Sequence, residues 1–258
     1  MIICGETMRT KNITLLVFVM MTLAAAGCTQ LAPTRASLPP SESKVLTSAE
    51  PAAAPVTVNA HTLDYSNDYI SVSIIYPEIS GMRDGQAQRI INETVYNDLK
   101  GKAQAIEAQA QQDAKESKLR IVYSMDAVFS IARNDGRVLS IQLDISMYQG
   151  GANVATDSAF INVINTEKAF QPTFPELFID GVDYSATINE KIRAIIASSP
   201  ESEMYDFQTV SPDQWYYLTD TALVVVFPRY AITPGVYGEP EFVISFDEIS
   251  DILIPDVQ

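Results

Sequence analysis

The sequence is short of histidine, cysteine and basic residues, and each shortage excludes a kind of functional site. Among 258 residues there is one histidine, His61, and there are two cysteines, Cys4 and Cys28. Zinc sites draw on several histidine and cysteine ligands, and hydrolases of the Ser-His-Asp or Cys-His type need an imidazole that the fold positions. We therefore interpret His61, at the start of the folded part, as a solvent-facing residue, and we predict neither a metal site nor a catalytic histidine.

Motifs that bind other cofactors are missing as well. The sequence has no Walker loop, no G-x-G-x-x-G pattern, no G-x-S-x-G elbow and no D-x-D-x-D-G calcium loop, so we predict no cofactor. Lys and Arg number 17 against 32 Asp and Glu, which gives a formal net charge of −15. Because phosphate binding needs a basic surface, this charge argues against nucleic acid as a partner. It favours basic partners instead, although solubility alone also accounts for it.

The first 27 residues have the pattern of an export signal. Arg9 and Lys11 precede an apolar run over 13–26, and small residues lead up to Cys28. The run is too short for a comfortable membrane span, and the sequence Leu-Ala-Ala-Ala-Gly-Cys resembles a bacterial lipobox, whose cysteine is lipidated. We predict a signal peptide over 1–27 and a lipoprotein held through Cys28 in the cell envelope, at the outer membrane facing the periplasm if the cell is Gram-negative. Met8 begins a cleaner signal than Met1, so we expect Met8 to be the true start.

Residues 28–58 are predicted to form a tether. Their alanine, proline, serine and threonine cannot build a packed core. Both cysteines lie in or directly after the signal, so we expect the mature domain to contain no disulfide. Processing would remove Arg9, Lys11 and Glu6, one net positive charge, and would leave a formal charge of −16.

The folded part opens with patterns of a long helix and a hairpin. Two short strands are expected over 63–65 and 70–76, the second ended by Pro77. Apolar residues at three- and four-residue spacing predict a helix over 86–116. Period-two alternation over 119–131 and 139–147, around Asn134-Asp135-Gly136, predicts a hairpin, and 154–164 is expected to return as a third strand.

The C-terminal part is also predicted to contain strands that follow one another without a helix between them. A second amphipathic helix is predicted over 183–198, capped by Asp183. The apolar run 223–227 and the alternating run 242–246 read as strands, and a short helix is expected over 247–253. Since helices do not alternate with strands, the predicted class is α+β: antiparallel sheets, one long N-terminal helix and a second helix packed on one face.

Two segments are candidates for a binding site. One is the loop between the last two strands, which is stiffened by prolines and carries Pro228, Tyr230, Pro234 and Tyr237. A stiff loop that presents tyrosines favours recognition; the alternative is a hairpin connection with the tyrosines packed back onto the sheet. The other is the turn after 139–147, whose candidates are Tyr148, Gly150, Gly151 and Asn153. Paired glycines allow a close approach to a partner or a tight turn between strands.

These two segments resemble a known family. The patterns F-P-x-Y-x-I-x-P and G-x-P-E-F-x-I-x-F-x-E-I over 227–249, with the glycine turn upstream, are similar to the C-terminal domain of RsiV-like proteins. That domain occurs in anti-sigma factors that sense lysozyme and beside the catalytic domain of PdaC-type peptidoglycan deacetylases. The resemblance implies a PdaC-like part over 59–165, an RsiV-like part over 166–258, and loops at this end that engage lysozyme. Family members usually have histidine at the position of Asn153.

Three functions follow in order of preference. The first is a non-enzymatic, lipid-anchored envelope protein that binds lysozyme or a similar basic cell-wall-active protein. The second is an accessory or structural lipoprotein that contacts peptidoglycan itself. The third is a cell-wall-active enzyme, for which Asp126 and Asp144, on the polar faces of the hairpin arms, are the carboxylates to test. Charged residues on a wet sheet face usually serve solubility and prevent edge pairing, which places the enzyme last.

Overall fold

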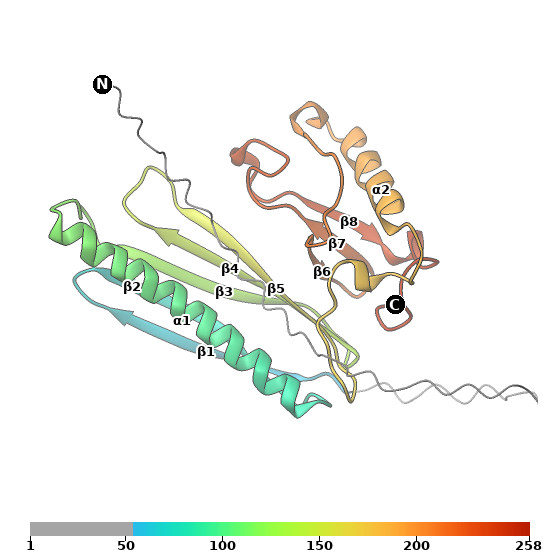
Figure 1. Ribbon diagram of the computed structural model, residues 1–258, viewed down its shortest axis with the longest axis horizontal. Helices are drawn as coiled ribbons and strands as arrows, with labels where there is room; N and C mark the ends of the chain where they lie inside the picture. The colour runs from blue at the N-terminus through green and yellow to red at the C-terminus, as the bar shows by residue number, and fades with distance from the viewer. Residues whose placement is uncertain (1–53) are drawn as a thin grey trace, which may run out of the picture. The chain divides into compact units, whose positions relative to one another are not determined.

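The computed structural model describes residues 54–258, which form a mixed five-stranded sheet, a three-stranded antiparallel sheet and two α-helices (Figure 1). The predicted α+β class is confirmed. The expected signal peptide, Cys28 and all but the last residues of the expected tether lie outside the described residues.

The larger sheet has the strand order β1-β2-β3-β4-β5. Its strands are β1 (Thr57–Ser66), β2 (Ile70–Ser80), β3 (Tyr123–Asn134), β4 (Val138–Tyr148) and β5 (Ala155–Ile164). Neighbours pair antiparallel, as predicted, except for β2 and β3, which run parallel between Ile70 and Ile74. The long helix between these two strands carries the chain back to the same end of the sheet, which a parallel pair requires. Hairpin signals in the sequence reveal only local pairs, so they could not show this one.

The first two strands are longer than the sequence predicted. Pro77, expected to end the second strand, lies inside β2 opposite Ala60. The pairing of β2 with β3 stops at Ile74, so beyond it β1 is the only strand among residues 54–258 that pairs with β2. A proline is tolerated there, because an N–H missing on the unpaired side of a strand breaks no ladder hydrogen bond.

The helix α1 (Gly85–Lys115) confirms the predicted span to within one residue and runs along one face of the five-stranded sheet (Figure 1). Asp84 caps it, since its carboxylate accepts hydrogen bonds from the N–H groups of Gln86 and Ala87. The apolar stripe of the helix is buried against the face of the sheet that carries the inward residues of β2, β3 and β4. The buried helix residues are Ile91, Leu99, Ala103, Ile106 and Ala110.

We expect Gly101→Ala to raise the free energy of unfolding by up to ~1 kcal/mol. Gly101 lies in the interior of α1, and a Cβ added there meets nothing within 4 Å. Alanine gains because glycine loses more backbone entropy in a helix. Urea unfolding with tryptophan fluorescence measures the change. The control is Gly136→Ala in the β3–β4 turn, which should destabilise because Gly136 has a φ of 88°. A destabilised Gly101→Ala variant would contradict the prediction.

The C-terminal sheet has the order β6-β7-β8, formed by β6 (Trp215–Leu218), β7 (Ala222–Val226) and β8 (Glu241–Ser245). Every residue of β7 is buried, as its apolar run predicts. The helix α2 (Tyr184–Ser198) has the predicted span and the predicted cap, Asp183. The short helix expected over 247–253 was wrong: a single 3₁₀ turn at Phe246–Glu248 stands there.

Buried hydrogen bonds join the two sheets. The Ser140 hydroxyl on β4 donates to Asn162 Oδ1 on β5 at 2.6 Å and accepts the N–H of Leu218 on β6 at 3.0 Å. Asn162 Nδ2 in turn donates to the carbonyl of Tyr216 at 2.8 Å. All four residues are buried. The hydrogen bonds therefore fix β6 across β4 and β5.

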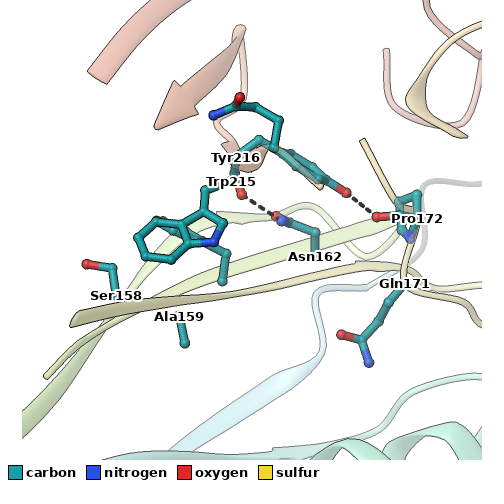
Figure 2. A pocket seen from close by; sticks show the side chains of 9 residues that line it. Ser158, Ala159, Asn162, Gln171, Pro172, Trp215 and Tyr216 are labelled. Atoms are coloured by element: carbon teal, nitrogen blue, oxygen red, sulfur yellow. Dashed lines mark hydrogen bonds between the residues drawn. The ribbon is translucent and has the colours of Figure 1, made fainter. Parts of the chain in front are cut away.

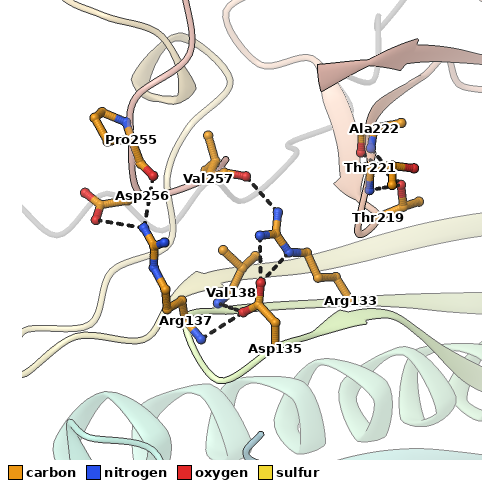
Figure 3. Close-up of polar contacts among 10 residues, drawn as sticks. All are labelled: Arg133, Asp135, Arg137, Val138, Thr219, Thr221, Ala222, Pro255, Asp256 and Val257. Atoms are coloured by element: carbon orange, nitrogen blue, oxygen red, sulfur yellow. Dashed lines mark hydrogen bonds and ion pairs between the residues drawn. The ribbon is translucent and has the colours of Figure 1, made fainter. Parts of the chain in front are cut away.

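A second connection ties the β3–β4 turn to the C-terminus (Figure 3). The guanidinium of Arg133, 6% exposed, donates to the carbonyl of Val257 at 2.7 Å and to the carboxylate of Asp135, with its Nε at 2.8 Å. Burial opposes the ionisation of Asp135, yet hydrogen bonds from the Val138 N–H, Arg133 and the Arg137 N–H hold the pKa of this carboxyl below its usual value. The turn predicted from Asn-Asp-Gly is thus also an anchor for the C-terminal segment.

Candidate functional site

The proline-rich loop leaves a buried strand and is closed at its base. The N–H of Phe227 donates to the carbonyl of Pro240 at 2.9 Å, so the loop between them starts and ends at one point. A 3₁₀ turn at Gly235–Tyr237 and a positive φ at Gly238 fold the middle of the loop. The loop therefore projects from the β7–β8 hairpin and is folded by turns, as its prolines and glycines predict.

Tyr230 is the most exposed tyrosine of this loop and has an unusual backbone. Its side chain is 70% exposed and its φ is 70°, in the left-handed region that a residue with a Cβ rarely adopts. The ring lies against Gly235, where a Cβ would overlap it, and the guanidinium of Arg229 lies 5.6 Å from the ring centroid. Arg229 Nε also donates to the carbonyl of Gly235 at 2.7 Å. Glycine at 235 thus allows the aromatic ring to lie where it does, and a strained, exposed aromatic is a feature of binding loops.

The glycine turn connects β4 to β5 and is exposed. Gly150 has a φ of 84°, so its backbone favours glycine, and an added Cβ would lie 3.7 Å from the ring of Tyr123. Tyr148, opposite Ser124 at the end of β4, is half-buried. Gly151 and Asn153 are exposed.

One pocket brings part of the loop and part of the turn together. This cavity of about 390 Å³, which we call the Tyr230 pocket, is lined by residues of the turn, β5, β6 and the loop. The predicted residues Asn153, Pro228 and Tyr230 line it. The other predicted residues do not: Tyr148, Gly150, Gly151, Pro234 and Tyr237. The two segments that the sequence singled out thus share a pocket through three of their eight candidates.

Two residues of this pocket were not identified from the sequence. Trp215 starts β6, and Glu239 precedes the end of the loop. Glu239 accepts a hydrogen bond from the Ser158 hydroxyl of β5 at 2.6 Å, so it fixes the loop to the edge of the larger sheet. Trp215 is the single tryptophan of the chain, and tryptophan is the residue type most enriched at binding hot spots. The sequence could therefore have pointed to Trp215, because it is the single tryptophan.

Trp215 also lines a second cavity of about 300 Å³, the Trp215 pocket (Figure 2). Its walls include Ser158, Phe160 and Asn162 of β5, with Gln171 and Gln214. The ring of Phe160 lies 6.0 Å from that of Trp215 and stacks with that of Tyr217. Figure 2 shows that the hydrogen bonds from Asn162 to Tyr216 and from Tyr216 to Pro172 lie in its wall. Trp215 therefore separates two hollows along β5.

Carboxylates dominate the charge around the site. Asp157 is paired with Lys102 at 2.9 Å, and Glu241 accepts a hydrogen bond from the Tyr217 hydroxyl at 3.0 Å. Burial, the hydrogen bond to Glu241 and the charges of Glu241 and Asp144 raise the pKa of Tyr217 to about 12. The neutral tyrosine thus sits among negative groups, which suits a basic ligand.

The remaining candidates lie apart from the two pockets. Asp126 and Asp144 are exposed and lie on the same face of neighbouring strands, opposite Ser146 and Val128 respectively. His61 is on β1, where its Nε2 lies 2.5 Å from Oε2 of Glu78. Over 54–258, no group of three or more His, Cys, Asp or Glu side chains is placed to hold a metal ion. No helix in this part of the chain is long and apolar enough to cross a membrane.

Each half of the fold matches a known protein family. Residues 63–156 match a family described as Deacetylase PdaC, and residues 175–247 match a family described as a protein of unknown function, DUF3298. Anti-sigma-V factor RsiV of Bacillus subtilis (strain 168) is 27% identical over 198 residues, which cover 72% of this chain and 67% of the relative. The chain thus combines a PdaC-type N-terminal part with a DUF3298-type C-terminal part and is a distant homologue of RsiV.

Solved structures share the fold. A DUF3298 family member from Bacteroides fragilis NCTC 9343 superposes with a TM-score of 0.59 at 12% identity, over 80% of this chain and 96% of the other. A DUF3298 family protein from Pseudomonas aeruginosa PAO1 has a TM-score of 0.52 at 16% identity, over 81% and 97%. At these identities the likeness shows the fold alone.

Proposed function

We propose that this chain is a non-enzymatic binding protein of the bacterial cell envelope that recognises a basic, lysozyme-like protein through the Tyr230 pocket. The observation that carries the proposal is that Asn153, Pro228 and Tyr230, from two segments far apart in the sequence, line one cavity. The distant homology to RsiV supports it, because RsiV-like proteins sense lysozyme.

The electrostatics of the site fit a basic partner. Asp157 and Glu239 line the Tyr230 pocket, and its one basic residue, Arg229, is held by the carbonyl of Gly235. Long-range attraction raises the rate of encounter between oppositely charged proteins. The association rate should therefore fall as salt rises, while the dissociation rate changes less.

The predicted lipid on Cys28 completes the proposal. An anchor there would hold the domain at a membrane surface on the extracytoplasmic side, where the domain would encounter a cell-wall-active protein. Fatty-acid labelling of the chain in its own host, with Cys28→Ser as the unlabelled control, tests the anchor separately from the binding site.

Tyr230→Ala is expected to weaken the binding of a basic lysozyme by about thirtyfold, or ~2 kcal/mol, because truncation of a central aromatic removes an interface anchor. Calorimetry at low salt against a panel of basic lysozymes measures the affinity. Gly235→Ala should weaken binding as well, because the new methyl group takes the place of the Tyr230 ring. Tyr237→Ala tests the half-buried tyrosine of the same loop.

The controls lie away from the pocket. Tyr96→Ala removes a tyrosine from α1, and Asp126→Ala removes a carboxylate from the sheet face, so both should bind within twofold of the unchanged protein. If no lysozyme binds more tightly than about millimolar, the lysozyme proposal fails, and an accessory protein that contacts peptidoglycan becomes the better account. Equal losses in Tyr230→Ala and Tyr96→Ala would show that the pocket is not the site.

A further inference from the structure

The strand β5 is an edge of the five-stranded sheet and leaves a row of backbone groups unpaired. The N–H and C=O of Ile164 bond to Phe170, on the side away from β4. Backbone groups alternate between the two sides of a strand, and the β4–β5 register is continuous. The N–H and C=O groups of Thr156, Ser158, Phe160 and Asn162 therefore point to the same free side. Within residues 54–258 they have no hydrogen-bond partner.

This edge lacks the usual protection against added strands. Exposed edges are normally blunted by charged side chains, prolines or bulges. The sequence of β5, Ala155–Ile164, contains no proline and no lysine, and its pairing has no register shift. Its one charged residue, Asp157, is paired with Lys102 of α1. The edge is thus open to another strand.

Hollows lie on both faces of this edge. On the helix side, a groove of about 180 Å³, the α1–β5 groove, is lined by Ile91, Thr94, Val95 and Asp98 of α1 with Ala159 and Ile161 of β5. On the other side lie the Trp215 and Tyr230 pockets. A strand added to β5 would direct alternate side chains into the α1–β5 groove and toward the two pockets.

The chemistry of the two sides differs. The α1–β5 groove is mainly aliphatic, with Asp98 as its one charged residue. The opposite side offers the indole of Trp215 and the carboxylate of Glu239, whereas the Asp157 carboxylate lies on the helix side with Lys102. An occupant therefore needs aliphatic side chains at every second position and basic side chains between them.

We propose that the free edge of β5 binds an extended peptide segment of a partner protein as a sixth strand, with aliphatic side chains in the α1–β5 groove and basic side chains over Trp215 and Glu239. The main chain of the segment would pair with the unpaired groups of Ser158 and Phe160. This inference goes beyond the proposed lysozyme-like partner and does not depend on it.

The test uses the full chain and the peptide acetyl-Lys-Val-Lys-Val-Lys-Val-Lys-amide. Trp215 is the only tryptophan, so its fluorescence reports occupation of the edge by a peptide that has none. Saturable binding is expected, and acetyl-Glu-Val-Glu-Val-Glu-Val-Glu-amide should bind at least tenfold more weakly. Ser158→Pro removes an outward N–H without breaking a hydrogen bond to β4 and should weaken the basic peptide at least tenfold. Asp126→Ala, at a residue that lines neither the α1–β5 groove nor the two pockets, should bind within threefold.

A second variant keeps the test decisive if Ser158→Pro fails to fold. Thr94→Phe fills the α1–β5 groove from an exposed helix position and should weaken the peptide at least tenfold. Asn97→Phe, at an exposed position of α1 outside the groove, should not. Unchanged peptide binding in both Ser158→Pro and Thr94→Phe overturns the proposal, as does equal binding of the acidic peptide. If sedimentation shows a dimer that Ser158→Pro dissociates, the occupant is a second copy of the chain and the proposed peptide is wrong. Failure of lysozyme binding alone leaves these results unaffected.

Discussion

Arg133→Ala is expected to lower the free energy of unfolding by about 3 kcal/mol. The buried guanidinium bonds to the carbonyl of Val257 and to Asp135, and it lies 5.6 Å from the ring centroid of Phe246 (Figure 3). Removing one partner of a buried ionic contact leaves the other polar groups without hydrogen bonds, which typically costs 3–5 kcal/mol. We place the loss at the lower end because Asp135 is partly exposed.

Arg137→Ala is the matched control. Arg137 comes from the same turn and bonds to the carbonyl of Pro255 at 2.9 Å, but its side chain is half exposed. Contacts of exposed charges contribute about 0–1 kcal/mol, so this variant should change stability by less than 1 kcal/mol. Urea unfolding at pH 7 measures both. Equal effects of the two substitutions would contradict the account of Arg133 as the anchor of the C-terminal segment.

The same contact predicts a dependence on pH. The pKa of Asp135 is lower in the folded protein than in the unfolded chain, where an aspartate has a pKa of about 3.9. Its contribution is therefore complete above about pH 4 and is lost as the pH falls through the folded pKa. Arg133→Ala should lose less stability than the unchanged protein between pH 5 and pH 2, because one of the groups that lowers this pKa is gone.

Local patterns in the sequence identified the elements but not how they assemble. The 3.6-residue period of α1, the cap at Asp183 and the period-two arms of β3 and β4 each depend on neighbours in the chain, and each prediction is confirmed. The parallel pairing of β2 with β3 depends on residues about fifty positions apart, and no turn signal marks it. For the same reason the sequence could not show that Pro77 lies inside β2, because that depends on which side of the strand is unpaired.

The candidate site shows the same division. Residue types pointed to Tyr230, Pro228 and Asn153, because a stiff aromatic loop and a glycine turn are visible locally. That Glu239 bonds to Ser158, or that Trp215 lies between two hollows, depends on the packing of β6 against β5. That these residues bind a partner is still a prediction.

Asn162→Leu is expected to lower the free energy of unfolding by about 3 kcal/mol. Leucine has the same branched arrangement of side-chain heavy atoms as asparagine but removes the hydrogen bonds of Asn162 to Ser140 and to the carbonyl of Tyr216. Two buried polar groups then lack partners, at about 1–3 kcal/mol each. Gln142→Leu is the control on the neighbouring strand, since its amide bonds only to the exposed carboxylate of Asp144, and it should cost less than about 0.5 kcal/mol.

A double-mutant cycle shows whether these bonds act together to hold β6, and with it Trp215, against β5. Ser140→Ala removes the donor to Asn162 and the acceptor of the Leu218 N–H. Because the two substitutions share one hydrogen bond, the double variant should lose less stability than the sum of the single variants, by about 1 kcal/mol. Urea unfolding followed by Trp215 fluorescence measures all four proteins. Strictly additive losses would mean that Ser140 and Asn162 hold β6 independently, so that neither hydrogen bond strengthens the other in placing Trp215 between its two pockets.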